Sequence, residues 1–303
     1  MTRPTTALVF STDEAFAPLA KGLVLSISSQ VERGEFDLKL VDIGCSAETL
    51  AWMNSHGVEV KVFDRPKFLR PSKNVLKPYQ DAQFCRPFLP RLFPGYEVYV
   101  WCDSDIWIQD ISSVRLYRDI ANENPDKIPI SPIVDVSYTY LYSDFCEFTR
   151  YSKIWFDECY GSTISTTYLN RAVFSSGIFA MHRDCQIWLL WEQEIQQILK
   201  RTFTSHTIFH LGEQTALNYL IYAHDKSIPL SAEHNYNCHL GNLVRGEDDT
   251  VVIGSPPLRN IGVVHLSYSS KMMGSYIENN LLYQSGKYLT DQEKTNLLRL
   301  SHY

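Results

Sequence analysis

The sequence predicts an α/β fold in which helices flank a mostly parallel central sheet. Two observations lead to this prediction. Along the first part of the chain, short apolar runs rich in β-branched residues alternate with longer amphipathic stretches, which is typical of βαβ units. Farther along, the run Val98–Trp107 begins as a strongly apolar strand and then carries two carboxylates. Polar groups at such a strand end are typical of open α/β sheets, whose ligand crevice lies at the strand ends.

The N-terminal elements follow from hydrophobic period and turn residues. Apolar residues of Phe16–Gln30 recur at helical spacing after the polar turn Ser11–Asp13. Residues 64–94 hold six prolines. Because proline fixes φ and lacks an amide donor, we expect a loop around one short helix there. The expected strands are Thr6–Phe10, Phe36–Val41 and Glu59–Phe63, and the expected helices are Phe16–Gln30 and Glu48–His56.

The later elements include a long connection. Asp135–Thr167 is rich in Tyr, Ser and Asp but weakly periodic, so we expect an excursion over the sheet. Asp184 is placed to cap the helix Cys185–Lys200. We assign residues 1–273 to one α/β domain and residues 274–303 to a C-terminal tail with a helix near Thr290–Leu300. Further strands are expected at Ile128–Ile133, Ser176–Met181, Val251–Ile253 and Gly262–Leu266, and further helices at Val114–Asn122 and, after Gly212, at Glu213–Ala223.

Composition narrows the class of protein. A chain of 303 residues with 45% hydrophobic residues can bury a sizeable core. The formal net charge is −6 and no basic run of five residues occurs, which argues against nucleic acid as a partner. We see no signal peptide and no apolar run of about 18 residues, so we expect no transmembrane segment. The seven scattered cysteines form no Cys-x-x-Cys pair, which indicates reduced thiols and a cytoplasmic protein.

The most informative motif is the pair Asp103 and Asp105, separated by Ser104. Carboxylates beside an apolar core are costly unless something neutralises them. Two acids one residue apart at a strand end can direct oxygens at one divalent cation, which in turn can hold a diphosphate. This reading predicts a nucleotide-sugar enzyme. The competing interpretation is a polar strand end whose acids are simply solvated.

Six segments, taken in order, resemble glycosyltransferase family 8, and the resemblance runs from about Ala7 to Lys271. This family contains retaining nucleotide-sugar transferases of the GT-A fold, among them glycogenin and bacterial lipopolysaccharide galactosyltransferases. Phe16, Ser175 and Tyr268 depart from the residues that are usual at their positions in the family, which are Tyr, Asn and Gly. The segments are Ala7–Phe16, Phe84–Pro90, Asp103–Asp105, Phe174–Ala180, Glu213–Asn218 and Val264–Lys271.

The resemblance implies roles for particular residues. The turn after the first strand would hold the uridine, and a basic pair would contact the donor phosphate or sugar. For Lys77 a solvated surface charge is an equally good interpretation. Gly177 is suited to close approach of a ligand, or to a bulge in its strand. The implied donor-binding residues are Ser11, Thr12, Asp13, Lys77, Arg86, Asp103, Ser104, Asp105, Ser176, Gly177 and Lys271; the metal ligands are Asp103, Asp105 and His265; the catalytic residues are Glu213 and Gln214.

These roles predict a metal-dependent retaining glycosyltransferase. Two carboxylates and an imidazole suit octahedral Mn²⁺, with Mg²⁺ as a substitute. The enzyme would move a hexose from a UDP-sugar, UDP-glucose or UDP-galactose, to a hydroxyl of a saccharide or glycoconjugate. Retention is implied by the family. Because an amide oxygen is a poor nucleophile, we expect a front-face route in which Gln214 steadies the cationic ring and Glu213 holds the sugar hydroxyls.

Two alternatives remain beside the transferase. An inactive nucleotide-sugar or carbohydrate-binding protein would keep the fold and the donor site, and the departures at Ser175 and Tyr268 are compatible with it. A phosphatase of the haloacid dehalogenase type also uses Asp-x-Asp after a strand. There the pair follows the first strand and usually precedes Gly-Thr, whereas here Ile106-Trp107 follows it. The tyrosines of Asp135–Thr167 would either stack on sugar faces or form a satellite hydrophobic cluster.

Overall fold

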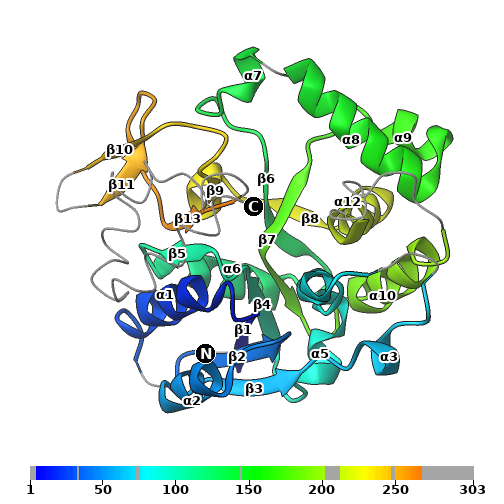
Figure 1. Ribbon diagram of the computed structural model, residues 1–303. Helices are drawn as coiled ribbons and strands as arrows, with labels where there is room; N and C mark the ends of the chain where they lie inside the picture. Colours follow the sequence, from blue (N-terminus) through cyan, green and yellow to red (C-terminus); the bar gives the residue numbers. More distant parts are fainter. Residues whose placement is uncertain are drawn as a thin grey trace.

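The computed structural model describes residues 5–32, 34–72, 76–143, 145–201, 212–246 and 250–267. Its centre is a seven-stranded sheet in the order β3-β2-β1-β4-β7-β6-β8 (Figure 1). Every neighbouring pair is parallel except those of β7, which runs antiparallel to β4 and β6. The predicted α/β fold with a mostly parallel sheet is therefore confirmed. The strands are β1 (Thr6–Thr12), β2 (Asp37–Asp42), β3 (Glu59–Val62), β4 (Val98–Cys102), β6 (Ile128–Pro132), β7 (Phe174–His182) and β8 (Ser227–Pro229).

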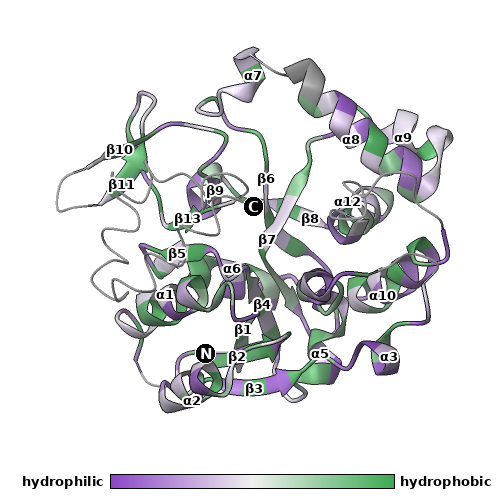
Figure 2. Cartoon of the chain, in the orientation of Figure 1, coloured by the Kyte–Doolittle hydropathy of each residue, from purple (hydrophilic) through white to green (hydrophobic). Residues whose placement is uncertain are grey.

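Helices cover both faces of this sheet. The side-chain alternation of each strand sends successive residues to opposite faces. In β4, Tyr99 and Trp101 join the core beneath α10 and α12, whereas Val98 and Val100 join the core beneath α1, α2 and α6. Both sets are buried, and in Figure 2 the central strands are mainly coloured as hydrophobic. The helices are α1 (Ala17–Ser28), α2 (Ala47–Ser55), α6 (Ser112–Glu123), α10 (Ile187–Ile198) and α12 (Gly212–His224).

The proline-rich segment 64–94 is more helical than expected. The prediction of one short helix was wrong, because the described part forms five short helical turns. Prolines occupy the first or second position in four of them, where the missing amide hydrogen is not needed. The turns are α3 (Arg65–Phe68), η1 (Pro78–Gln80), α4 (Asp81–Phe84), η2 (Arg86–Phe88) and α5 (Leu89–Leu92).

The excursion between β6 and β7 also contains regular structure. It forms α7 (Tyr140–Ser143), α8 (Phe145–Tyr160) and α9 (Ser162–Tyr168). Tyr160 stacks on Tyr219 of α12 with ring centres 4.4 Å apart, and Tyr168 stacks on Tyr222 at 5.7 Å. These tyrosines therefore form a hydrophobic cluster with α12. This packing stabilises helices whose hydrophobic period is too weak to predict them from the sequence.

Two further three-stranded sheets complete the fold. One has the order β5-β13-β9 and the other β10-β11-β12. The predicted strand Val251–Ile253 is confirmed as β11, and Gly262–Leu266 contains β13. The elements are β5 (Ile106–Ile108), β9 (Tyr236–Asn237), β10 (Leu243–Arg245), β11 (Val251–Ile253), β12 (Arg259–Asn260), β13 (Val263–His265) and the turn η3 (Ala232–His234).

Three expectations need comment. Helix α10 begins at Ile187 with Gln186 as its N-cap, so the cap predicted at Asp184 was wrong; Asp184 instead lies 3.5 Å from the His182 imidazole. The C-terminal tail and the domain boundary at residue 273 lie outside the described residues. Among the described residues, no helix combines the length and apolar character that crossing a membrane requires.

Candidate metal and donor site

The turn Asp103–Asp105 joins the large sheet to a small one. Strand β4 ends at Cys102, and the Asp103 amide donates to the Gly177 carbonyl of β7 at 2.7 Å. The Ile106 amide then donates to the Asp103 carbonyl at 3.1 Å, which closes the turn and starts β5. Both carboxylates are therefore held at the C-terminal end of β4, between two sheets.

Strand pairing brings His265 to the same place. Strand β13 runs antiparallel to β5, and His265 lies opposite Ile106 in this register. The Leu266 amide donates to the Asp105 carbonyl at 2.9 Å, which extends the contact to the acidic turn. Asp105 and His265 are 160 residues apart in the sequence, and backbone hydrogen bonds on both sides of the histidine bring them together.

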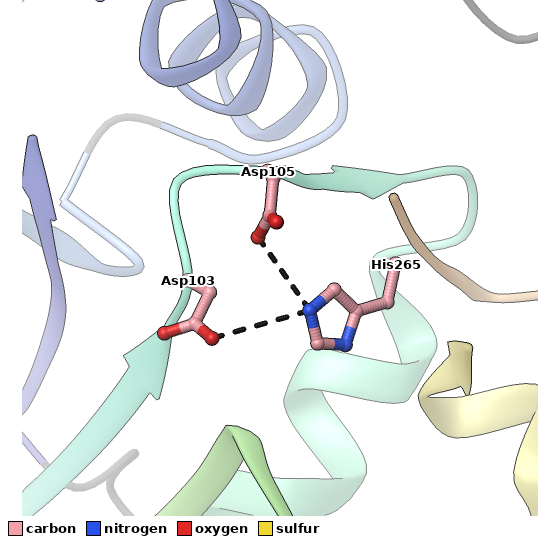
Figure 3. Close-up of side chains that lie close together, drawn as sticks. All are labelled: Asp103, Asp105 and His265. Atoms are coloured by element: carbon pink, nitrogen blue, oxygen red, sulfur yellow. Dashed lines mark ion pairs between the residues drawn. The ribbon is translucent and has the colours of Figure 1, made fainter. Parts of the chain in front are cut away.

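The three side chains converge, as Figure 3 shows. His265 Nε2 lies 3.5 Å from Asp105 Oδ1 and 3.9 Å from Asp103 Oδ2. One ligand atom from each of the three residues lies within 4.8 Å of the others. In the neutral tautomer that carries its hydrogen on Nδ1, the lone pair of Nε2 faces two carboxylate oxygens. A divalent cation between them removes this repulsion, so the donor set fits Mn²⁺ or Mg²⁺.

A buried arginine connects Asp103 to α12. Arg86 Nη2 donates to Asp103 Oδ1 at 2.5 Å, while Nη1 donates to Ser176 Oγ at 2.6 Å and to Glu213 Oε2 at 2.8 Å. Arg86 and Glu213 are both almost fully buried. The planar fork of guanidinium donors suits this bridging role better than a point charge would. The structure thus brings four of the predicted donor or catalytic residues into one network.

The charges of this network are unbalanced. One guanidinium faces the two carboxylates of Asp103 and Glu213. Burial raises the pKa of Glu213 to about 7; Arg86 opposes this rise and the charge of Asp103 adds to it. Burial also raises the pKa of Asp103, against the effect of Arg86. In the described residues Glu213 Oε1 and Arg86 Nε are buried and have no hydrogen-bond partner.

Gln214 lies beside this network but its amide oxygen is engaged. The oxygen Oε1 accepts hydrogen bonds from the Ser176 backbone amide at 3.0 Å and from Ser176 Oγ at 3.2 Å. The carbonyl of Gln214 accepts from Asn218 Nδ2 at 2.8 Å, and Asn218 also bonds the backbone of Phe174. The predicted pair Glu213 and Gln214 is therefore fixed against the start of β7.

The other predicted donor residues are placed less uniformly. Ser11 and Thr12 are buried at the end of β1, which pairs with β4, and Asp13 Oδ1 accepts from the Phe16 amide at 3.0 Å. Ser104 is half-buried in the acidic turn. Lys77 is exposed, and its ammonium group lies 5.9 Å from the centre of the Tyr79 ring rather than in the network. Lys271 lies outside the described residues.

Two residues that sequence reasoning missed support the cluster. Trp101 Nε1 donates to Asp103 Oδ1 at 2.7 Å, and Asn235 Oδ1 lies 3.0 Å from His265 Nδ1. Neither position carries a sequence signal, because Trp101 belongs to an apolar strand and Asn235 to an irregular stretch. Gly177, predicted either to allow close approach of a ligand or to form a bulge in its strand, has its backbone against the imidazole, and a Cβ there would lie 2.3 Å from His265 Cε1.

Comparison with known structures agrees with this architecture. No protein-family model and no curated sequence matches the chain. Among solved structures, the fold is similar to that of glycosyltransferases. The galactosyltransferase LgtC in complex with donor and acceptor sugar analogues matches with a TM-score of 0.57 and 12% identity, over 96% of this chain and 99% of that chain. An active-site mutant of LgtC matches with a TM-score of 0.56 and 11% identity over the same shares.

A longer protein also matches over part of its length. The bifunctional glycosyltransferase WbbM matches with a TM-score of 0.47 and 13% identity, over 77% of this chain and 40% of that chain. The chain thus spans less than half of WbbM but almost all of LgtC. At these identities the likeness to LgtC concerns the fold, and it agrees with the predicted GT-A architecture.

Proposed function

We propose that the chain is a metal-dependent retaining glycosyltransferase of the family 8 type. It would move a hexose from a UDP-sugar, UDP-galactose or UDP-glucose, to a hydroxyl of a saccharide or glycoconjugate. The observation that carries the proposal is the convergence of Asp103, Asp105 and His265 at the end of β4. The likeness of the fold to a galactosyltransferase supports it.

In this proposal the three converging residues hold Mn²⁺ or Mg²⁺. A bound divalent cation neutralises the diphosphate as it becomes the leaving group. Glu213 would hold the sugar hydroxyl groups, and Arg86 would contact the phosphate or the sugar of the donor. The end of β1, with Ser11 to Asp13, holds the uridine. The parallel register of β1 and β4 supports this arrangement, because both strand ends meet at one edge of the sheet.

Transfer would follow a front-face route. The bond between the anomeric carbon and the diphosphate oxygen breaks, and the acceptor oxygen bonds to the same face of that carbon. The proton of the acceptor hydroxyl passes to the departing diphosphate oxygen, so no protein carboxylate needs to act as nucleophile. Gln214 stabilises the positive charge of the ring through its amide oxygen. The contacts of that oxygen with Ser176 keep it oriented beside Glu213.

The test is a donor panel with and without metal. Purified protein is incubated with UDP-galactose or UDP-glucose and Mn²⁺, and free UDP is quantified with and without added saccharides. We expect metal-dependent UDP release, a product whose anomeric configuration matches the donor by NMR, and at least about a 10²-fold loss in Asp105→Ala. Asp126→Ala is the matched control, since Asp126 is exposed and pairs with Lys226 away from the site.

Three outcomes would contradict the proposal in whole or in part. Donor binding without UDP release or sugar transfer would instead support the inactive binding protein. Undiminished turnover in excess chelator, or in Asp105→Ala, would remove the cation from the reaction. An inverted product would contradict the retaining mechanism while leaving the transferase class intact.

A further inference from the structure

We propose that Asn235 is a positioning residue of the metal site, and that it fixes the proton of His265 on Nδ1 so that Nε2 faces the two aspartates. The inference rests on the metal site of the proposed function but does not depend on sugar transfer. It assigns a role to a buried amide that is not among the predicted donor-binding residues.

The first argument comes from the chemistry of the contact. Asn235 Oδ1 lies 3.0 Å from His265 Nδ1, and both side chains are buried. An amide oxygen can only accept, so Nδ1 carries the hydrogen in this contact. In a neutral ring the lone pair is then on Nε2, the nitrogen that lies 3.5 Å from Asp105 and 3.9 Å from Asp103. Partners of this kind set the tautomer and orientation of histidine ligands.

The second argument is the rigidity of Asn235 itself. Asn235 is completely buried, with 0% of its surface exposed. Its backbone amide donates to the Ala232 carbonyl at 2.9 Å, and its carbonyl accepts from Asn237 Nδ2 at 3.1 Å. The Asn237 amide in turn donates to the Tyr138 hydroxyl at 3.1 Å. Asn235 is thus fixed by the fold before any ligand binds.

The third argument is a cost. Asn235 Nδ2 is buried and has no hydrogen-bond partner in the described residues. Leaving such a group unpaired typically costs about 1–3 kcal/mol. An apolar side chain would avoid this cost but would leave His265 Nδ1 without its acceptor. The amide is therefore better explained by its oxygen than by packing.

The surroundings of the ring complete the arrangement. The backbone of Gly177 closes one side of the imidazole, since a Cβ there would lie within 3.1 Å of three ring atoms. Asp103 is oriented in a similar way. Trp101 and Arg86 both donate hydrogen bonds to its Oδ1, and its Oδ2 faces His265. Each of these two ligands thus has one atom held by the protein and one atom directed at the cation position.

The experiment measures Mn²⁺ binding in the absence of nucleotide. Free Mn²⁺ is followed by electron paramagnetic resonance during titration of wild type, Asn235→Leu and Asn235→Asp. We expect Leu to raise the Kd for Mn²⁺ about 10–100-fold, because the acceptor is lost. Asp keeps an acceptor at the same position and should stay within a few-fold of wild type. Asn218→Leu is the matched control, because Asn218 is also buried and, within the part of the chain that the structure describes, hydrogen-bonds backbone groups of Phe174 and Gln214.

A second measurement needs no variant. NMR of protein with ¹⁵N-labelled histidine, loaded with diamagnetic Mg²⁺, reports which nitrogen of His265 carries the proton. A proton on Nδ1 supports the inference, and a proton on Nε2 overturns it. This readout decides the question even where Asn235→Leu does not fold.

The failures can be told apart. Wild type that binds Mn²⁺ while Asn235→Leu binds it equally well overturns the role of Asn235 and leaves the proposed function standing. Wild type that binds no Mn²⁺ overturns the metal site, and the proposed function and this inference fail together. An equal loss in Asn218→Leu and Asn235→Leu would show a general effect of buried-amide removal and would also overturn the inference.

Discussion

Gly177→Ala adds one methyl group beside His265, in the wall of the candidate metal site. The new Cβ would lie 2.3 Å from His265 Cε1, 2.8 Å from Nδ1 and 3.1 Å from Nε2, whereas ordinary contacts begin at 3.4 Å. The imidazole ring must therefore move by about 1.1 Å, or β7, which carries Gly177, must move away from β13, which carries His265. A shift of that size breaks the 3.0 Å contact with Asn235 and moves Nε2 relative to the aspartates.

Two magnitudes follow from this displacement. Overpacking a well-filled site typically costs about 1–3 kcal/mol of unfolding free energy. Misplacing a histidine ligand should weaken metal binding by about 10–100-fold, the range found when the orienting partners of a ligand are lost. Urea denaturation without metal measures the first quantity, and Mn²⁺ titration measures the second.

Gly212→Ala is the matched control for this substitution. A Cβ at Gly212 would lie 3.8 Å from Ile198 Cγ2, an ordinary van der Waals distance, and it meets no metal ligand. We expect this control to bind Mn²⁺ like wild type. Gly177→Ala that binds Mn²⁺ with wild-type affinity would refute the claim that close packing of the β7 backbone fixes the position of the His265 imidazole.

Further substitutions test the arginine network. Arg86→Lys keeps the charge but not the fork that reaches Asp103, Ser176 and Glu213, so unfolding free energy should fall by about 1–3 kcal/mol in urea titrations; an unchanged midpoint and slope would contradict this. Trp101→Phe removes the indole donor to Asp103 Oδ1 and should raise the Kd for Mn²⁺ about tenfold, which titration checks; no change would mean that Arg86 alone orients the carboxylate. Glu213 holds its proton up to about pH 7 when folded but only to about pH 4.5 when unfolded, so its contribution is complete below pH 4.5 and is lost as pH rises through 7. The loss is on the order of 3 kcal/mol. Urea titrations of metal-free wild type and Glu213→Gln at about pH 5 and about pH 8 should therefore diverge, and parallel stabilities would exclude the raised pKa.

The sequence was most informative where local pattern and tertiary burial agree. The strand before Asp103 was predictable because it is apolar throughout, as a strand buried on both faces must be. The helices of Asp135–Thr167 were not, since they pack through Tyr160 and the adjoining Tyr168 on tyrosines of α12 that lie 59 and 54 residues farther along the chain. Asp184 was predicted to be an N-cap from its residue type alone. The helix begins at Ile187, two residues later than a cap at Asp184 requires.

The site shows a similar division. The proposed metal ligands Asp103, Asp105 and His265 are chemically distinctive residues, so residue type and order along the chain were enough to predict them. Their supporting residues are not distinctive in type. Trp101 and Asn235 act through one donor or one acceptor whose direction is set by strand register, and register between distant strands is invisible in a single sequence.

The net charge of the cluster formed by Asp103, Asp105, Glu213, Arg86 and His265 bears on the order in which a cation and a diphosphate would bind. Asp103, Asp105 and Glu213 supply three carboxylates, and Arg86 is the guanidinium that contacts two of them. Above pH 7, where the carboxyl group of Glu213 is also ionised, and with His265 neutral, as a metal ligand must be, a divalent cation brings this set to zero net charge. A diphosphate approaching the metal-free cluster would meet uncompensated carboxylates, whereas after metal binding it meets a cation with open coordination positions. Under the proposed function, this charge balance favours binding of the cation first and of the nucleotide-sugar second. The buried arginine network would contribute by holding Asp103 in place before either one binds.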